Sequence, residues 1–401
     1  MCGVAGFFID SPKKYHFNFD LALKDMTDSL IHRGPDDAGI WFDKSNGIGI
    51  GHRRLSILDL SSAGHQPMDS PNGRFIIAFN GEIYNHEDIR AEIENLDKKI
   101  NWRGHSDTET ILAAFEVFGI EESIKKFIGM FAFSLWDRKR KVLTLARDRV
   151  GEKPMYYGWQ NTSLGNVFIF GSELKAIKSF PELNLAIDRG SLSLFLSHAY
   201  VPCPHSIYED IFSLEPGEIL EVSIDEKTYK RKKYWDVSEV IKNNTVNKFN
   251  GTSGDAVKKL ESLITSSVKR QMISDVPLGA FLSGGIDSST IVSLMQSQSS
   301  KPIKTFTIGF NEKGFDEAKY AKSIAKHLGT DHTELYVDAD SAMKVIPEMH
   351  SIYCEPFADP TQIPNYIVSK LANKDVKVAL SGDGGDELFA GYSLSLIHIC
   401  R

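Results

Sequence analysis

The sequence changes its pattern near residue 250, and this change constrains the fold more than any other feature. Before it, short apolar or alternating runs are separated by turn residues, and helical periodicity is sparse. We expect strands at Val4–Ile9, Arg74–Asn80, Met130–Trp136, Lys141–Ala146 and Val167–Phe170, and helices at Leu21–Leu30 and Thr108–Phe118. This order predicts an α+β layered domain of antiparallel sheets with helices packed outside.

After residue 250, apolar strands alternate with helical segments. The expected strands are Val276–Leu282, Ile303–Phe310, Thr333–Val337 and Val376–Leu380, and the expected helices include Ser288–Gln298 and Asp316–Leu328. Alternation of this length predicts an α/β domain, with a parallel sheet and helices on both faces. An amphipathic helix carrying Val257, Leu260, Leu263, Ile264 and Val268 precedes it, and the polar stretch Asn243–Gly254 is interpreted as a linker or surface loop.

Composition narrows the class of protein. The 46 basic and 53 acidic side chains give a net charge of −7, which argues against nucleic acid as a partner. No apolar run approaches the roughly 18 residues that would span a membrane. The four cysteines are scattered without a CxxC pair, so we expect a reduced, cytoplasmic enzyme without a metal cluster. The basic run Lys230–Lys233 is interpreted as a solvated hairpin edge.

Cys2 is a candidate nucleophile because of its position. It follows the initiator Met and precedes Gly3, and a small second residue usually permits removal of Met1. The α-amino group that this exposes has a pKa near roughly 8, so part of it is a neutral base beside its own thiol. A lone Cys at this position can also be accidental, so whether Cys2 is a nucleophile depends on which residues surround it in the fold.

Three further segments could serve such a nucleophile. Asn80 and Gly81 leave an apolar strand, where an amide and a backbone N–H could stabilise an oxyanion, although Asn-Gly is also a common turn. Ser106 and Glu109 form the pattern of a capping box, which leaves Asp107 free to hold the α-ammonium of an amino acid. Arg54 could grip the matching α-carboxylate, or it could be a solvated surface group.

Together these segments resemble the class II glutamine amidotransferase family, whose fold is that of the N-terminal nucleophile hydrolases. The motifs that carry the resemblance occur in the order and spacing of the family, at Met1–Phe8, His32–Asp36, Arg54, Asn80–Asn85, Ser106–Glu109, Gly129–Asp137, Ala146–Arg149, Gly151, Lys153 and Pro154. The resemblance implies that Cys2 attacks the side-chain amide of glutamine and releases ammonia. It also implies Asn80 and Gly81 as the oxyanion hole, and Arg54, Asn80, Glu82 and Asp107 as glutamine-binding residues.

A glycine loop marks the second half of the chain. Ser283, Gly284, Gly285, Asp287 and Ser288 lie between a buried strand and a helix, where backbone N–H groups, hydroxyls and the helix dipole can hold an anion. Walker and dinucleotide-binding patterns are absent from it. The loop resembles the pyrophosphate loop of ATP pyrophosphatases, which cleave ATP to AMP and pyrophosphate and belong to the adenine-nucleotide α-hydrolase-like fold.

A second loop, which begins at Ser381 and Gly382, leaves the last expected strand. Its three acids, Asp383, Asp386 and Glu387, would repel one another, so a cation or a positive substrate is expected nearby. Asp287 and Asp386 are candidate Mg²⁺ ligands, because one or two carboxylates with phosphate oxygens usually hold that ion. On the pyrophosphatase resemblance, Leu282 and Ile308 would line the adenine pocket.

The two halves in sequence resemble the glutamine-hydrolysing asparagine synthetase family as far as Tyr392. The resemblance implies that ATP activates the aspartate β-carboxylate as β-aspartyl-AMP, that ammonia from the Cys2 site displaces AMP, and that Asp383 lies near the reacting carboxylate. It divides the chain into an amidotransferase domain over 2–215, a connecting hairpin and linker over 216–254, and a synthetase domain over 255–401. Glutamine, aspartate, ATP and Mg²⁺ are the implied ligands, and a homodimer is compatible with it.

The sequence departs from the family at its end. Members usually continue well past the second loop, whereas this chain stops nine residues after Tyr392. We therefore expect a longer reading frame at the source, a synthetase domain incomplete at its C-terminus and an aggregation-prone 401-residue chain. Three alternatives stay open. The first is a relative that acts on another carboxylate, such as a β-lactam synthetase or a surface-polymer amidotransferase. The second is a truncated chain that has glutaminase activity only or acts as a binding module, and the third is a tRNA-modifying pyrophosphatase.

Overall fold

The computed structural model describes residues 1–9, 17–96, 100–223, 228–310, 316–389 and 391. The chain divides into two compact units, each described here by itself. The first comprises Met1–Lys248 with His350–Ala358, and the second comprises Phe249–Met349 with Asp359–Arg401.

The first unit contains two sheets, and the described strands of each pair antiparallel. One sheet has the order β10-β8-β9-β1-β3-β2, with β10 Phe212–Ser213, β8 Tyr156–Thr162, β9 Gly165–Gly171, β1 Gly3–Ile9, β3 Ile48–Arg54 and β2 Asp37–Asp43. The other has the order β12-β11-β7-β6-β5-β4, with β12 Thr228–Lys233, β11 Glu218–Ser223, β7 Val142–Arg147, β6 Gly129–Asp137, β5 Phe75–Ile83 and β4 Met68–Asp69. The expected antiparallel α+β domain is confirmed.

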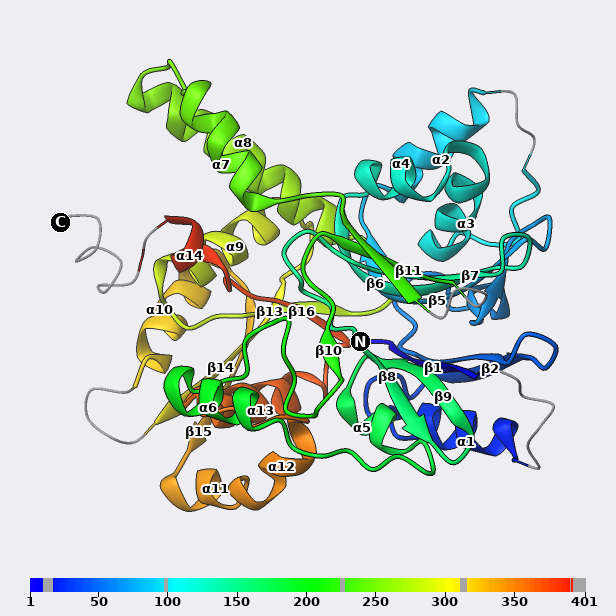
Figure 1. Cartoon of the computed structure of the whole chain (residues 1–401). Coiled ribbons are helices and arrows are strands. Elements are labelled where there is room, and N and C mark those ends of the chain that lie inside the picture. Colours follow the sequence, from blue (N-terminus) through cyan, green and yellow to red (C-terminus); the bar gives the residue numbers. More distant parts are fainter. Residues whose placement is uncertain (10–16, 97–99, 224–227, 311–315, 390, 392–401) are drawn as a thin grey trace. The chain divides into compact units, whose positions relative to one another are not determined.

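Helices cover the outer face of each sheet, which gives four layers (Figure 1). One group consists of α2 His86–Glu94, α3 Asp107–Phe118 and α4 Ile120–Lys126, and the other of α1 Phe19–Asp28 and α5 Leu174–Lys178. In β5, Phe75, Ile77 and Phe79 pack toward α3, whereas Ile76 and Ala78 pack toward the other sheet. This strand is buried on both faces, and it carries Asn80 and Gly81 between the layers.

A nine-residue segment from late in the chain completes the first unit. Residues His350–Ala358 group with it, although their neighbours in sequence belong to the second unit. Lys175 Nζ donates to Ser351 O at 2.9 Å, and the Ala358 N–H donates to the carbonyl of Ala199, which follows α6 Arg189–His198, at 2.8 Å. The first unit is therefore assembled from both halves of the sequence.

The second unit has a parallel sheet with the strand order β15-β14-β13-β16 among its described residues. The strands are β13 Leu278–Phe281, β14 Lys304–Phe310, β15 Asp331–Val337 and β16 Val378–Leu380. The helices are α8 Ser253–Gln271, α9 Ile286–Ser297, α10 Ala318–Leu328, α11 Ala339–Met343, α13 Gln362–Ala372 and α14 Gly385–Phe389. Of α12 Met349–Ile352, only the first residue lies in this unit. Ala280 and Leu282 pack with α8, α9 and α10, whereas Phe281 packs with α13. Successive side chains thus reach helices on opposite faces, and the expected α/β sheet is confirmed.

The linker expected at Asn243–Gly254 is wrong in part. Residues 243–246 are the last turn of α7 Val237–Val246, and Ser253 begins α8. The side chains of Asn244 and Thr245 bond to carbonyls one turn back, at 2.8 Å each, so polar residues continue the helix. The apolar face expected on α8 is buried only at its end: Val268 is in the core, but Val257 is 63% exposed.

Two expectations about the surface of the molecule can be compared with the structure. No helix in the described part of the chain is long and apolar enough to cross a membrane. The basic run lies on β12, an edge strand of its sheet, as expected. Its ammonium groups pair with acids, Lys232 with Glu121 at 2.6 Å and Lys233 with Glu215 at 3.2 Å.

Candidate functional site

A pocket in the first unit brings together the residues predicted to use glutamine. It contains about 540 Å³ of empty space, open solvent included. Its wall contains Met1, Cys2, Arg54, Leu55, Ile57, Leu58, Gln66, Phe79, Asn80, Gly81, Glu82, Ser106, Asp107, Thr108, Met130 and Lys153. Cys2, Arg54, Asn80, Gly81, Glu82 and Asp107 are therefore neighbours in space.

Cys2 lies immediately before β1, at the wall of this pocket. The Leu55 N–H donates to its Sγ at 3.4 Å, and Arg33 Nε donates to its carbonyl at 2.8 Å. Burial raises the pKa of the Cys2 thiol, and the positive terminal amine beside it works in the opposite direction. A thiol in this setting needs a nearby base before it can act as a nucleophile.

Asn80 and Gly81 lie in β5 with their polar groups available. Asn80 is fully buried, and neither its side-chain nitrogen nor its oxygen has a hydrogen-bond partner in the described structure. A Cβ at Gly81 would lie 2.2 Å from the Met130 carbonyl oxygen, so only glycine fits there. Because buried amides are nearly always paired, the free Asn80 side chain indicates a ligand site.

Glu82 and Asp107 provide two buried carboxyl groups. The Asp107 carboxylate accepts the Ile83 N–H at 2.9 Å, whereas Glu82 Oε1 has no partner among the described residues. Burial, followed by the charge of Asp107, raises the pKa of Glu82 to about 7, and burial raises the pKa of Asp107 too. Two such groups favour a cationic ligand, and the α-ammonium of an amino acid is one.

Arg54 is buried, and its guanidinium already has partners. Its Nη1 donates to the Ser61 carbonyl at 3.1 Å, and its Nη2 donates to the carbonyls of Leu58, at 3.2 Å, and Asp59. These bonds fasten the loop after β3 to the pocket. Binding of the α-carboxylate of glutamine by Arg54 stays a prediction.

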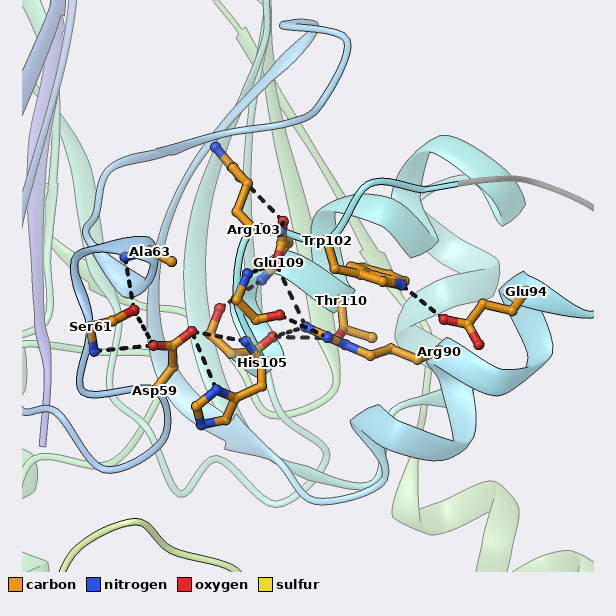
Figure 2. Close-up of polar contacts among 12 residues, drawn as sticks. Asp59, Ser61, Ala63, Arg90, Glu94, Trp102, Arg103, His105, Glu109 and Thr110 are labelled. Carbon is orange, nitrogen blue, oxygen red and sulfur yellow. Dashed lines mark hydrogen bonds and ion pairs between the residues drawn. The ribbon is translucent and has the colours of Figure 1, made fainter.

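Two networks that the sequence did not indicate hold the loop before α3 (Figure 2). Asp59, 1% exposed, accepts the N–H of Ser61 at 3.1 Å, its hydroxyl at 2.5 Å and the N–H of His105 at 2.9 Å. Asp59 thus joins the loop that Arg54 fastens to the loop that leads into α3 at Asp107.

The second network supports the same loop from the helix side. Arg90 stacks on Trp102 and donates to the Gly104 and Ser106 carbonyls at 3.0 and 2.9 Å. Ser106 caps α3 by accepting the Glu109 N–H at 3.3 Å, as expected. The Glu109 carboxylate, expected to return to the cap, instead accepts the N–H groups of Arg103 and Gly104.

In the second unit, the loop between β13 and α9 carries Ser283, Gly284 and Gly285, and Asp287 lies in the first turn of α9. Gly284 has φ of +89°, and a Cβ there would lie 2.8 Å from the Ala321 nitrogen. Ser288 Oγ accepts the Ser283 N–H at 3.2 Å, but no described side chain caps the first turn of α9. The free N–H groups of that turn are suited to an anion.

The loop after β16 lies against this one. A Cβ at Gly382 would lie 2.8 Å from the Ser288 nitrogen, and one at Gly385 would lie 2.6 Å from the Asp287 carboxyl carbon. Ser381 Oγ bonds to Asp383 at 3.0 Å. Leu282 and Ile308 lie at the carboxyl ends of β13 and β14, the same edge of the sheet.

The residues expected to hold Mg²⁺ are Asp287, in the first turn of α9, and Asp386, in the first turn of α14, directly after the two adjoining loops. Within the described ranges, no group of three or more Asp, Glu, His or Cys side chains gathers that could hold a metal ion by itself. The donor set fits a cation that takes its remaining ligands from phosphate and water.

Two family models match the chain, the glutamine amidotransferase domain over residues 1–235 and asparagine synthase over residues 259–399. A Methanocaldococcus jannaschii protein, whose name assigns it provisionally to the glutamine-hydrolysing asparagine synthetases, is 37% identical over 93% of this chain and 73% of its own length. Asparagine synthetase 1 of Bacillus subtilis, named as glutamine-hydrolysing, is 37% identical over 98% of this chain and 59% of its own length.

The chain therefore spans 73% of the length of the first relative and 59% of the length of the second. Both halves of the sequence are matched in the same order as in the relatives. The chain belongs to the glutamine-hydrolysing asparagine synthetase family.

Proposed function

We propose that this protein makes asparagine from aspartate, using ATP and the ammonia that it releases from glutamine. It would yield AMP, pyrophosphate and glutamate through a β-aspartyl-AMP intermediate. Family membership supports this proposal, and the two separate sets of residues described above fit its two half-reactions. We include in it Mg²⁺ as the metal, the cytoplasm as the compartment and a homodimer as the assembly.

The glutaminase step would take place at Cys2 after removal of Met1. The α-amine takes the thiol proton, and the thiolate attacks the side-chain carbonyl of glutamine. The resulting oxyanion is stabilised by the Asn80 amide and the Gly81 N–H, while Glu82 and Asp107 hold the α-ammonium of the substrate. The amine then returns its proton to the leaving nitrogen, and water hydrolyses the thioester to glutamate.

The synthetase step would take place at the two adjoining loops of the second unit. The first-turn N–H groups of α9 and the serine hydroxyls bind the phosphates, and Leu282 and Ile308 lie beside the adenine. Asp287 and Asp386 would hold Mg²⁺, which neutralises phosphate charge when bound. Adenylation converts a poor leaving oxygen of aspartate into a good one, and Asp383 would lie near the reacting carboxylate.

The observation that carries the proposal is the unpartnered amide of Asn80 in the pocket of Cys2. A fully buried side chain with neither polar atom bonded is costly unless a ligand supplies the partner. The amide nitrogen of Asn80 is a donor of the kind that an oxyanion requires.

The test supplies amide-¹⁵N-glutamine, aspartate, Mg²⁺ and ATP to the purified chain, and follows glutamate, labelled asparagine, AMP and pyrophosphate together. Labelled asparagine equal to AMP is expected. The matched control is Cys2→Ala, which should make asparagine from added ammonium salt but not from glutamine. Glutamate without AMP would reduce the function to a glutaminase, and the absence of both products would refute the proposal.

A further inference from the structure

Lys153 is a buried cation in the Cys2 pocket to which the proposed mechanism gives no role. It is 6% exposed and lies between β7 and β8. Its N–H donates to Asp148 at 3.0 Å, and its carbonyl accepts Arg147 Nε at 2.8 Å. With both backbone groups fixed, the side chain is directed to the pocket wall rather than to solvent.

The ammonium of Lys153 contacts a residue that processing removes. Its Nζ lies 3.3 Å from the Met1 sulfur, and removal of Met1 takes this contact away. Burial lowers the pKa of Lys153, and the nearby charges of Glu152, Glu82 and Asp148 oppose this by favouring its charged form, whereas Arg33 does not. Asp148 accepts backbone N–H groups of its own loop, and burial raises the pKa of both Glu82 and Glu152, so the ammonium is balanced by several carboxyl groups rather than by one ion pair.

Arg33, the other cation near the chain terminus, differs because its charge is compensated. Its Nη1 pairs with Glu173 at 2.8 Å, and its Nε donates to the Cys2 carbonyl at 2.8 Å. The groups facing the terminal amine are the Cys2 thiol, Arg33, Lys153 and Glu82. Of the two cations, Lys153 is the one without a firm ion pair in the described structure.

We propose that Lys153 is a positioning residue for catalysis, whose ammonium keeps the α-amine of processed Cys2 in its neutral, basic form. The inference rests on the proposed glutaminase function. Cys2 and Lys153 line the same pocket, and a positive charge there disfavours a second one, so the amine more readily stays unprotonated. Burial works in the same direction, and it lowers the pKa of the terminal amine of the unprocessed chain to about 6.

Lys153 itself neither gives nor takes a proton in this scheme. The α-amine accepts the thiol proton when the C–S bond forms, and it returns that proton to the nitrogen when the C–N bond breaks. Without the Lys153 charge, the amine should hold its proton to higher pH. The acidic limb of the reaction should move upward accordingly.

The experiment uses the full chain after mass spectrometry of its N-terminal peptide has verified that Met1 is absent. The rate of Cys2 alkylation by iodoacetamide, read from that peptide, and glutaminase kcat/KM are measured against pH. In Lys153→Met, the midpoint of both profiles should rise by about one unit. Lys153→Arg, which keeps the charge, should restore the original midpoint, and Lys125→Met controls for loss of an exposed lysine.

Each outcome decides the question. An unchanged midpoint in Lys153→Met, or an equal shift in Lys153→Arg, overturns the role of the charge while leaving the glutaminase intact. If Lys153→Met does not fold, as judged by circular dichroism, Lys153→Gln provides the same comparison. A wild-type chain without Met1 that neither reacts with iodoacetamide at Cys2 nor hydrolyses glutamine refutes the proposed function instead.

Discussion

The contacts of Asp59 allow a prediction about the local stability of the pocket loops that does not depend on the reaction. The carboxylate of Asp59 accepts at least three hydrogen bonds, two from Ser61 and one from the His105 N–H, and it is almost completely buried. Its φ of +55° lies in the left-handed region, which Asp and Asn tolerate better than Ala. Asp59→Ala therefore removes three bonds and adds backbone strain at one position.

The size of the effect follows from these contacts. Three bonds to an ionised acceptor contribute roughly 1.5 kcal/mol each, the low end for a charged group, and the left-handed conformation costs Ala about 1 kcal/mol more. Opening of the two joined loops should then cost about 5.5 kcal/mol less free energy in Asp59→Ala, which corresponds to roughly 10,000-fold faster opening. Asp59→Asn keeps one acceptor and the tolerated conformation, so its effect should be about 1 to 2 kcal/mol.

Hydrogen exchange followed by mass spectrometry measures this opening in the whole chain. Peptides that contain Ser61 and His105 should exchange much faster in Asp59→Ala, and the KM for glutamine should rise because Arg54 and Asp107 adjoin these loops. Asp69→Ala, at a half-exposed ion pair with Arg138, is the control and should leave both peptides unchanged. Exchange at the His105 amide within a few-fold of wild type would refute the reasoning.

Three other predictions concern the two sites. Burial and the Asp107 charge raise the pKa of Glu82 to about 7, so the KM for glutamine should fall as pH rises through 7 and this carboxyl ionises, and Glu82→Gln should abolish the dependence. Asn80→Ala should lower glutaminase kcat about 100- to 1,000-fold with little change in melting temperature, since its side chain has no described partner to lose; a large stability loss would contradict this. Gly284→Ala should abolish ATP–pyrophosphate exchange, because φ is positive there and the new Cβ would lie 2.8 Å from the Ala321 backbone nitrogen. Gly329→Ala is the control: φ is positive there too, but its Cβ would have no atom within 4 Å, so exchange should be retained.

The strands with simple apolar patterns could be predicted from the sequence, and several others could not. β5, β6, β13, β14 and β16 were expected because burial leaves a clear apolar signature, and β15 was expected although Val337 is its one buried residue. β3 was missed because it contains Gly49, Gly51 and the fully buried His52. A Cβ at Gly51 would lie 2.0 Å from the Thr27 hydroxyl of α1, so the close packing of this helix requires glycine. Glycine is disfavoured in strands, which hid β3 in the sequence.

The candidate site was predictable where the chemistry depends on residue type. Cys2, Asn80, Glu82 and Asp107 were named from their motifs, and the structure brings them to one pocket. Asp59 was not, because its importance lies in contacts with His105, distant in sequence, and an Asp followed by serines is otherwise typical of a surface turn. Lys153 was noted only as part of a motif, since burial of its ammonium cannot be read from spacing.

The segment His350–Ala358 has a consequence for the order in which the protein is made. The first unit contains these residues, so it reaches its final set of contacts only when the ribosome has added about 110 residues beyond Lys248. At a synthesis rate of 5–20 residues per second, this interval lasts roughly 5 to 20 seconds. During that time the Lys175 ammonium and the Ala199 carbonyl lack the partners that they bond to later, so this part of the nascent unit is hydrated until the late segment docks.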